Sequence, residues 1–198
     1  MKYRTALLLA PLVALCACGT TPPAHFYTLA SLREAPAEAR PAPRPEFTLG
    51  IGPVTLPRYL DRPQIVSYTS GNELRLEDAH RWAEPLEQNF TRTLTENLSF
   101  LLGTERVVQY PGRRGVTPDA QVQVEVIRFD ARTDGTVTLH ARWNVLDRNG
   151  ATVIASRTDL GQKAATGNYD ALVAAHSEAL ARLSREIAGA IGKIVPQR

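Results

Sequence analysis

The residues of this chain best suited to chemistry are two cysteines and four histidines. A nucleophilic hydrolase needs an activated Ser or Cys beside a base, but the sequence has no Gly-x-Ser-x-Gly motif. The histidines lie far apart in the sequence, and none has the i, i+4 partner or nearby cysteines of a zinc site. They are His25, His80, His140 and His176. We therefore expect no catalytic residues, no bound metal and no cofactor, and we attribute the histidines to packing and solvent exposure.

Gly50-Ile51-Gly52 begins like a dinucleotide-binding motif. The third glycine is missing, Pro53 follows at once, and no helical pattern opens there. We interpret the segment as a strand that needs a close backbone approach.

The charge of the chain gives no sign of a nucleic-acid partner. It has 23 Lys and Arg against 20 Asp and Glu, a formal net charge of +3, and the cations are scattered rather than clustered. A nucleic-acid surface would show a dense basic run, often with interleaved aromatic residues. We exclude nucleic acid as a partner.

The N-terminus has the layout of a secretory signal peptide. Lys2 and Arg4 precede an apolar run over residues 6–15. That run is too short to span a membrane as a helix, which needs about 20 apolar residues. We therefore expect export of the chain and removal of this segment.

Both cysteines follow the apolar run. The segment Leu15-Cys16-Ala17-Cys18 resembles the lipobox of bacterial lipoproteins, in which a small residue precedes the cysteine that is acylated. Cys18 fits this pattern and Cys16 does not, because bulky Leu15 would precede it. We predict a signal peptide over residues 1–17 and lipidation of Cys18. The alternative is an ordinary signal peptide with two incidental cysteines.

The mature chain begins with a segment unlike the rest. Residues 18–46 comprise the expected lipid anchor, a short strand candidate at residues 25–30 and a proline-rich stretch at residues 31–46. The proline-rich stretch has no apolar periodicity and is typical of an extended linker. If the strand candidate docks onto the domain, this stretch is only a surface excursion.

Residues 47–198 show the periodicity of one α/β domain. Alternating patterns predict a strand at 47–54, a hairpin at 64–68 and 73–76, and a meander at 120–129, 136–146 and 151–155. Helical spacing predicts amphipathic helices at 81–102, with Asp78 as N-cap and Gly103 as terminator, and from Asn168 to near Ile194. The expected fold class is α/β, with a mixed, largely antiparallel sheet packed with two main amphipathic helices.

Two stretches resemble a known family. The run from Ile51 to Val66 and the later Arg81-Trp82-Ala83-Glu84-Pro85-Leu86, with Asn97-Leu98 closing the helix, are similar to the PqiC-type ABC-type transport auxiliary lipoproteins. The lipobox, the Phe26-Tyr27-Thr28-Leu29 opening and the order of elements agree with this family. The proline-rich insertion departs from it.

The resemblance implies a non-enzymatic component of an ABC/MCE-type system that moves lipids between two membranes. Its partners would be an MCE-domain periplasmic protein and inner-membrane transporter components, and some relatives form homo-oligomers. Gly19, where lipoproteins retained at the inner membrane often have aspartate, implies an outer-membrane anchor facing the periplasm. The alternatives are a stand-alone periplasmic lipoprotein that binds a lipid or small ligand, and a structural envelope lipoprotein.

A proline-bounded loop is the candidate docking site. Pro53, Pro57 and Pro63 would stiffen it, and Tyr and Arg are common at interface hot spots. The candidate partner-binding residues are Arg58, Tyr59, Leu60, Asp61, Arg62 and Trp82. The alternative is structural: Tyr59 and Leu60 pack inward and Asp61 pairs with a neighbouring arginine. Trp82 would then lie on the apolar stripe of its helix and pack in the core.

Overall fold

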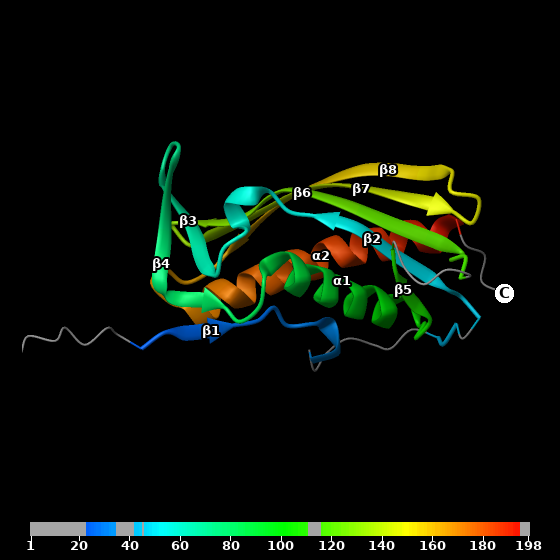
Figure 1. Ribbon diagram of the computed structural model, residues 1–198, viewed down its shortest axis with the longest axis horizontal. Coiled ribbons are helices and arrows are strands. Elements are labelled where there is room, and N and C mark those ends of the chain that lie inside the picture. Colours follow the sequence, from blue (N-terminus) through cyan, green and yellow to red (C-terminus); the bar gives the residue numbers. More distant parts are fainter. Residues whose placement is uncertain (1–22, 35–41, 45, 111–115, 195–198) are drawn as a thin grey trace, which may run out of the picture.

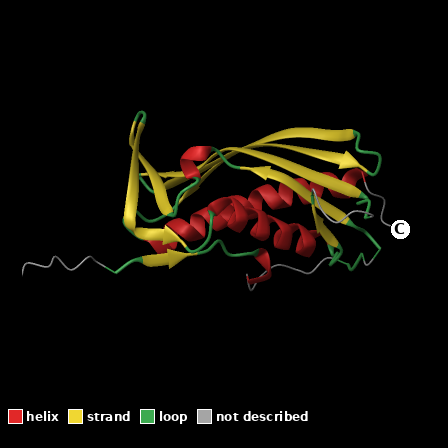
Figure 2. Ribbon diagram, in the orientation of Figure 1, coloured by secondary structure: helices red, strands yellow, loops and turns green. Residues whose placement is uncertain are grey.

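The computed structural model describes residues 23–34, 42–44, 46–110 and 116–194. They form one eight-stranded sheet with two long helices (Figures 1 and 2). The elements are β1 (His25–Tyr27), η2 (Leu32–Glu34), β2 (Leu49–Thr55), η3 (Arg58–Leu60), β3 (Gln64–Ser70), β4 (Glu73–Trp82), α1 (Leu86–Leu102), β5 (Val107–Gln109), β6 (Ala120–Arg132), β7 (Thr136–Asp147), β8 (Thr152–Lys163) and α2 (Tyr169–Ile194).

The sheet is mixed, and β6 is its central strand. One side of β6 pairs in parallel with β2 and, further along, with β3, while its other side pairs antiparallel with β7. The order is β1-β4-β3-β6-β2-β5, with β7 beside β6 and β8 beside β7. The long ladders, β6–β7, β7–β8 and β3–β4, are antiparallel. The predicted fold class is therefore confirmed.

Both helices pack against the same face of the sheet (Figure 1). Alternate residues of β6 and β7 point toward them, because side chains of a strand alternate between faces. The helices contribute residues three or four apart, which share one helical face. The fully buried side chains of this core include Phe90, Leu94, Leu98, Leu139, Leu180, Leu183 and Ile187.

Helix α1 begins later than the sequence predicts. Arg81 and Trp82 belong to β4, and α1 starts at Leu86 with Pro85 at the N-cap position. The prediction that Asp78 is the N-cap is wrong, because Asp78 lies inside β4. The extension of β4 is held by hydrogen bonds of Trp82 N to Pro63 O (2.7 Å) and Ala83 N to Tyr27 O (2.9 Å). Proline has no N–H to donate, so Pro85 is compatible with a helix start but not with the middle of one.

The other helix ends agree with the sequence. Gly103 adopts a left-handed conformation (φ 66°) and ends α1, as expected of a C-terminal glycine. Asn168 accepts a hydrogen bond from Ala171 N at 2.9 Å and caps the start of α2, which ends at Ile194. Among the described residues no helix is long and apolar enough to cross a membrane.

Gly52 in β2 lies where the sequence indicated a close backbone approach. Its φ is +120°, and a Cβ atom placed there would lie 2.3 Å from Tyr110 O. Only glycine fits this position without a shift of the backbone. The prediction of a strand with a close approach is therefore confirmed.

The N-terminal segment docks onto the domain. β1 pairs in parallel with the end of β4, and both Leu29 and Leu32 are buried. The signal peptide, Cys18 and residues 35–41 of the proline-rich stretch lie outside the described residues.

Candidate functional site

The predicted docking loop crosses from β2 to β3 and contains the short helix η3. Leu60 N donates to Pro57 O at 2.9 Å and Asp61 N to Arg58 O at 3.1 Å, which closes the turn. Leu60 is only 3% exposed and packs into the main core. The loop is therefore attached to the body of the domain at its centre, not only at its ends.

Tyr59 makes a second attachment, to the outer face of the sheet. Its Oη donates a 2.6 Å hydrogen bond to Asp130 Oδ2. Asp130 is completely buried, and Arg128 pairs with both of its carboxylate oxygens, at 2.6 and 3.2 Å. A buried carboxylate must be paired and hydrogen-bonded to be tolerated, and these two residues provide that.

The surroundings of this network fix the ionisation of Tyr59. Burial and the hydrogen bond to Asp130 raise the pKa of Tyr59 well above its usual value, so the phenol stays a neutral donor. The hydrogen bond to Asp130 also raises the pKa of Arg128. The Tyr68 ring completes the cluster, 4.8 Å from the Arg128 guanidinium and edge-on to Tyr59 at 6.4 Å. The cluster holds the loop over the sheet.

Two of the remaining loop residues, Arg58 and Asp61, are exposed. Arg62 is only partly exposed, and its Nε atom is buried. Within the part of the chain that the structure describes, no ion pair joins Asp61 to either arginine. Of the five predicted loop residues, Tyr59 and Leu60 therefore fix the loop, and Arg58 and Asp61 are presented on a fixed backbone.

Trp82 lies elsewhere. It is the last residue of β4 rather than part of a helix, so the prediction that places it on a helical stripe is wrong. The side chain is 4% exposed, and its ring meets the His176 ring edge-on at 5.6 Å. The structure thus places Trp82 in the core.

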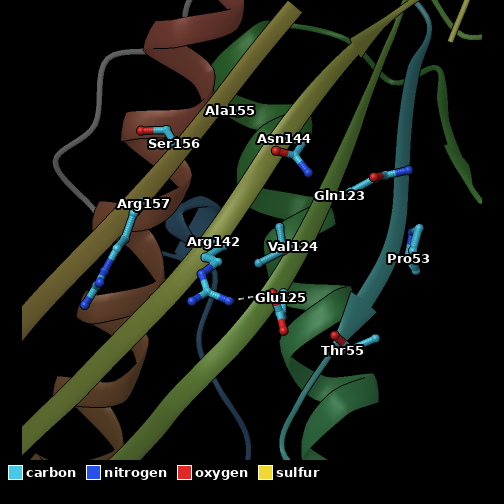
Figure 3. A pocket seen from close by; sticks show the side chains of 10 residues that line it. All are labelled: Pro53, Thr55, Gln123, Val124, Glu125, Arg142, Asn144, Ala155, Ser156 and Arg157. Carbon is cyan, nitrogen blue, oxygen red and sulfur yellow. Dashed lines mark ion pairs between the residues drawn. The ribbon is translucent and has the colours of Figure 1, made fainter. Parts of the chain in front are cut away.

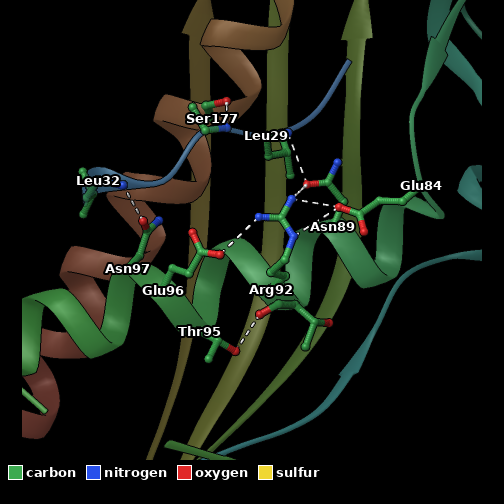
Figure 4. A network of polar contacts seen from close by, with 11 residues as sticks. Leu29, Leu32, Glu84, Asn89, Arg92, Thr95, Glu96, Asn97 and Ser177 are labelled. Atoms are coloured by element: carbon green, nitrogen blue, oxygen red, sulfur yellow. Dashed lines mark hydrogen bonds and ion pairs between the residues drawn. The ribbon is translucent and has the colours of Figure 1, made fainter. Parts of the chain in front are cut away.

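A strap formed by residues 27–34 crosses the two helices (Figure 4). Leu29 N donates to Asn89 Oδ1 at 3.2 Å, Ala30 N to Ser177 Oγ at 3.0 Å, and Leu32 N to Asn97 Oδ1 at 2.7 Å. Asn97 Nδ2 also donates to Ser184 Oγ at 3.2 Å, which joins the strap to α2. This site was not predicted from the sequence. The available signal was a pair of asparagines on the buried side of α1.

The outer face of the sheet carries a shallow hollow over β2, β6, β7 and β8 (Figure 3). Seven of the ten residues that line it have polar side chains, among them Gln123, Glu125, Arg142, Asn144 and Arg157. Arg142 lies 3.5 Å from Glu125, and both side chains are about 60% exposed. Such surface pairs contribute little to stability and re-pair easily.

The histidines are not all isolated in space. The His25 and His80 rings stack with centroids 5.3 Å apart, whereas His140 lies on the outer sheet face and His176 is buried between the sheet and α2. Burial lowers the pKa of His176 to about 4. Among the described residues no three His, Cys, Asp or Glu side chains are grouped to hold a metal.

These features define the architectural class of the protein: a one-sheet α/β module with a fixed surface loop and an open outer sheet face. A family model described as "ABC-type transport auxiliary lipoprotein component" matches residues 27–188, and the chain belongs to this family. The family is one of transport auxiliary lipoproteins and not a known class of enzymes.

Curated relatives and solved structures agree with this assignment. The chain is 34% identical over 95 residues to the intermembrane transport lipoprotein PqiC of Escherichia coli (strain K12) and to that of Shigella flexneri. The match covers 48% of this chain and 49% of each relative, so the chain spans about half the length of the curated relatives it matches.

Two crystal structures share the fold. An uncharacterized protein is 26% identical, with a TM-score of 0.70 over 86% of this chain and 99% of the other. A protein from Xanthomonas campestris has a TM-score of 0.69 over 85% of this chain and 94% of its own, and at 18% identity it shows the fold alone.

Proposed function

We propose that this protein is the non-enzymatic outer-membrane lipoprotein of an ABC/MCE-type system that carries lipids between the two bacterial membranes. The observation that carries the proposal is the family match over residues 27–188, with its likeness to the intermembrane transport lipoprotein PqiC. Lipidation of Cys18 would hold the domain at the periplasmic face of the outer membrane. There it would dock the periplasmic conduit to that membrane.

We assign the docking to the loop of residues 57–63. Loop ordering on binding costs free energy, and a loop already fixed in its bound form avoids that cost. Burial of Leu60 and the Tyr59–Asp130 hydrogen bond fix this loop without a partner. Its exposed charged residues, Arg58 and Asp61, are then available to bind an MCE-domain protein. That protein would belong to the same transport system as the inner-membrane transporter components.

Charge reversal tests this assignment. Arg58→Glu leaves Leu60 and Tyr59 in place, so it should weaken binding to the MCE-domain protein by about tenfold, or about 1.4 kcal/mol, without unfolding the domain. The measurement is binding of the purified lipoprotein to the immobilised MCE-domain partner. Arg182→Glu makes the same charge change at an exposed position of α2 and serves as the matched control. Equal binding by both variants would remove the loop from the interface.

A homo-oligomer has a candidate interface in β8. This strand of 12 residues is the free edge of the sheet beyond β7, and it contains no proline to block pairing. A long unprotected edge strand is a template for another chain. We propose that a second copy pairs there. Sedimentation of the native chain and of a Ser156→Pro variant tests this, and an unchanged mass would contradict it.

Two other functions make different predictions. A stand-alone lipid-binding lipoprotein should retain a stoichiometric ligand in native mass spectrometry, with no protein partner recovered. A structural envelope lipoprotein should sediment with purified peptidoglycan.

A further inference from the structure

Ring side chains gather at the end of the molecule where β1 enters. The His80 and Tyr169 rings stack with centroids 3.6 Å apart at an angle of 8°, and His25 stacks on His80 at 5.3 Å. Tyr27 Oη lies 2.9 Å from His80 Nδ1. These rings come from β1, β4 and the first turn of α2, so the cluster is a rigid part of the fold. Tyr27 and Tyr169 also pack against the main core, whereas His25 is exposed.

Phe26 projects from this end into solvent. It is 64% exposed, more than any other large hydrophobic side chain among the described residues. Strand alternation places it on the opposite side of β1 from His25 and Tyr27. Both β1 neighbours are therefore held by the ring cluster while the Phe26 ring is left free. An exposed apolar ring in this position is available to a lipid bilayer or to another protein molecule.

The distance along the chain from the expected anchor, Cys18, to Phe26 favours the bilayer. Eight Cα-to-Cα steps lead from Cys18 to Phe26, and a fully extended chain spans at most about 3.3–3.6 Å per step, or about 28 Å in total. On the other side of β1, the hydrogen bonds of Leu29 and Ala30 fix the strap to the helices, so the chain has no slack there. An acylated Cys18 thus keeps Phe26 within about 28 Å of the bilayer surface.

We propose that Phe26 and the side of β1 that carries it form a membrane-facing end that rests in the headgroup region of the bilayer that holds Cys18, while the Tyr27, His80 and Tyr169 rings on the other side of β1 hold that end rigid. This inference rests on the proposed lipidation. Aromatic rings favour the boundary between headgroups and acyl chains, and the apolar Phe26 ring can insert slightly deeper than a ring with a polar tip. The domain is thereby oriented as well as tethered. Figure 1 shows the β7–β8 turn at the opposite end of the molecule from β1, so in this orientation that turn would point away from the membrane.

Fluorescence quenching by brominated lipid tests the orientation. The full-length lipidated protein is reconstituted into vesicles of phosphatidylethanolamine and phosphatidylglycerol that contain phosphatidylcholine brominated on its acyl chains. Phe26→Trp introduces an exposed indole at the proposed contact, while Trp82 and Trp143 are each 4% exposed and provide a constant background. Val153→Trp is the matched control. Val153 is 46% exposed and lies near the start of β8. The ten Cα-to-Cα steps from Val153 to Lys163 span about 33 Å along this strand.

The proposal predicts loss of the fluorescence contributed by residue 26, with a blue shift of its emission, and no loss for residue 153. Co-flotation of the protein with the vesicles is measured in the same samples. Protein that floats with both indoles unquenched, or with residue 153 quenched instead, would overturn the membrane-facing end and leave the lipid anchor standing. Protein that does not float would overturn the anchor and this inference together.

Discussion

The Tyr59–Asp130 hydrogen bond makes a quantitative prediction about the docking loop. Tyr59→Phe removes one oxygen and leaves the ring against Tyr68. Hydrogen bonds to charged groups contribute about 1.5–3 kcal/mol, and Arg128 still pairs with the carboxylate, so we expect a loss near the lower end, about 2 kcal/mol. For a domain of this size that loss should lower Tm by roughly 4–8 °C.

Tyr68→Phe is the matched control. It removes the same atom from a neighbouring ring whose hydroxyl has no hydrogen-bond partner among the described residues, so its effect should stay within about 0.5 kcal/mol. The assay is urea unfolding followed by the fluorescence of Trp82 and Trp143, with both variants made in the Cys18→Ser background. If Tyr59→Phe is as neutral as Tyr68→Phe, the network does not hold the loop and the argument for a fixed docking site fails.

Three further changes test other parts of the structure. Burial lowers the pKa of His176 to about 4, whereas an unfolded histidine titrates near 6.5, so only the unfolded chain takes up this proton as the pH falls from 6.5 toward 4. The contribution of His176 to the free energy of unfolding is fully present above pH 6.5 and should fall by roughly 3 kcal/mol by pH 4. The urea unfolding midpoint of a His176→Gln variant should lack this part of the pH dependence. Asn97→Leu leaves Leu32 N without its acceptor. The amides of the strap should then exchange hydrogen faster than in the native chain, while the core amides should not change. Unchanged exchange of the strap amides would argue against the strap. Gly52 has a φ of +120°, and Gly52→Ala would place a Cβ 2.3 Å from Tyr110 O. The free energy of unfolding, measured by thermal unfolding, should fall by at least about 1–3 kcal/mol. The loss should clearly exceed that of Gly71→Ala, where φ is +48° but nothing lies within 4 Å of the added Cβ.

Regular periodicity made most of the fold predictable. The alternation of β6 and β7 and the long apolar stripe of α2 are local signals, and their elements appear where expected. The start of α1 could not be read in this way. Trp82 fits the helical spacing of the residues that follow it, but pairing of β4 with β1 and the hydrogen bond to Pro63 O keep it in a strand. Those partners lie far away in the sequence.

The same limit applies to the candidate site. The prolines around residues 57–63 indicated a stiff loop, but the sequence did not show that Asp130, seventy residues later, anchors it. Asp130 falls one residue beyond the strand predicted at residues 120–129, and an aspartate there would be expected to lie in solvent. Its burial results from η3 folding over the outer face of the sheet, which is a tertiary event. The parallel pairings of β2 and β3 with β6 and the short strand β5 were likewise beyond local pattern.

Recovery of partners from gently crosslinked envelopes tests the central claim most directly. The tagged native chain is compared with Cys18→Ser and with Arg58→Glu, and copurifying proteins are identified by mass spectrometry. Our account predicts that an MCE-domain protein is recovered with the native chain and is diminished in both variants. Recovery of the lipoprotein alone, or only with cell-wall material, would contradict a role in intermembrane transport.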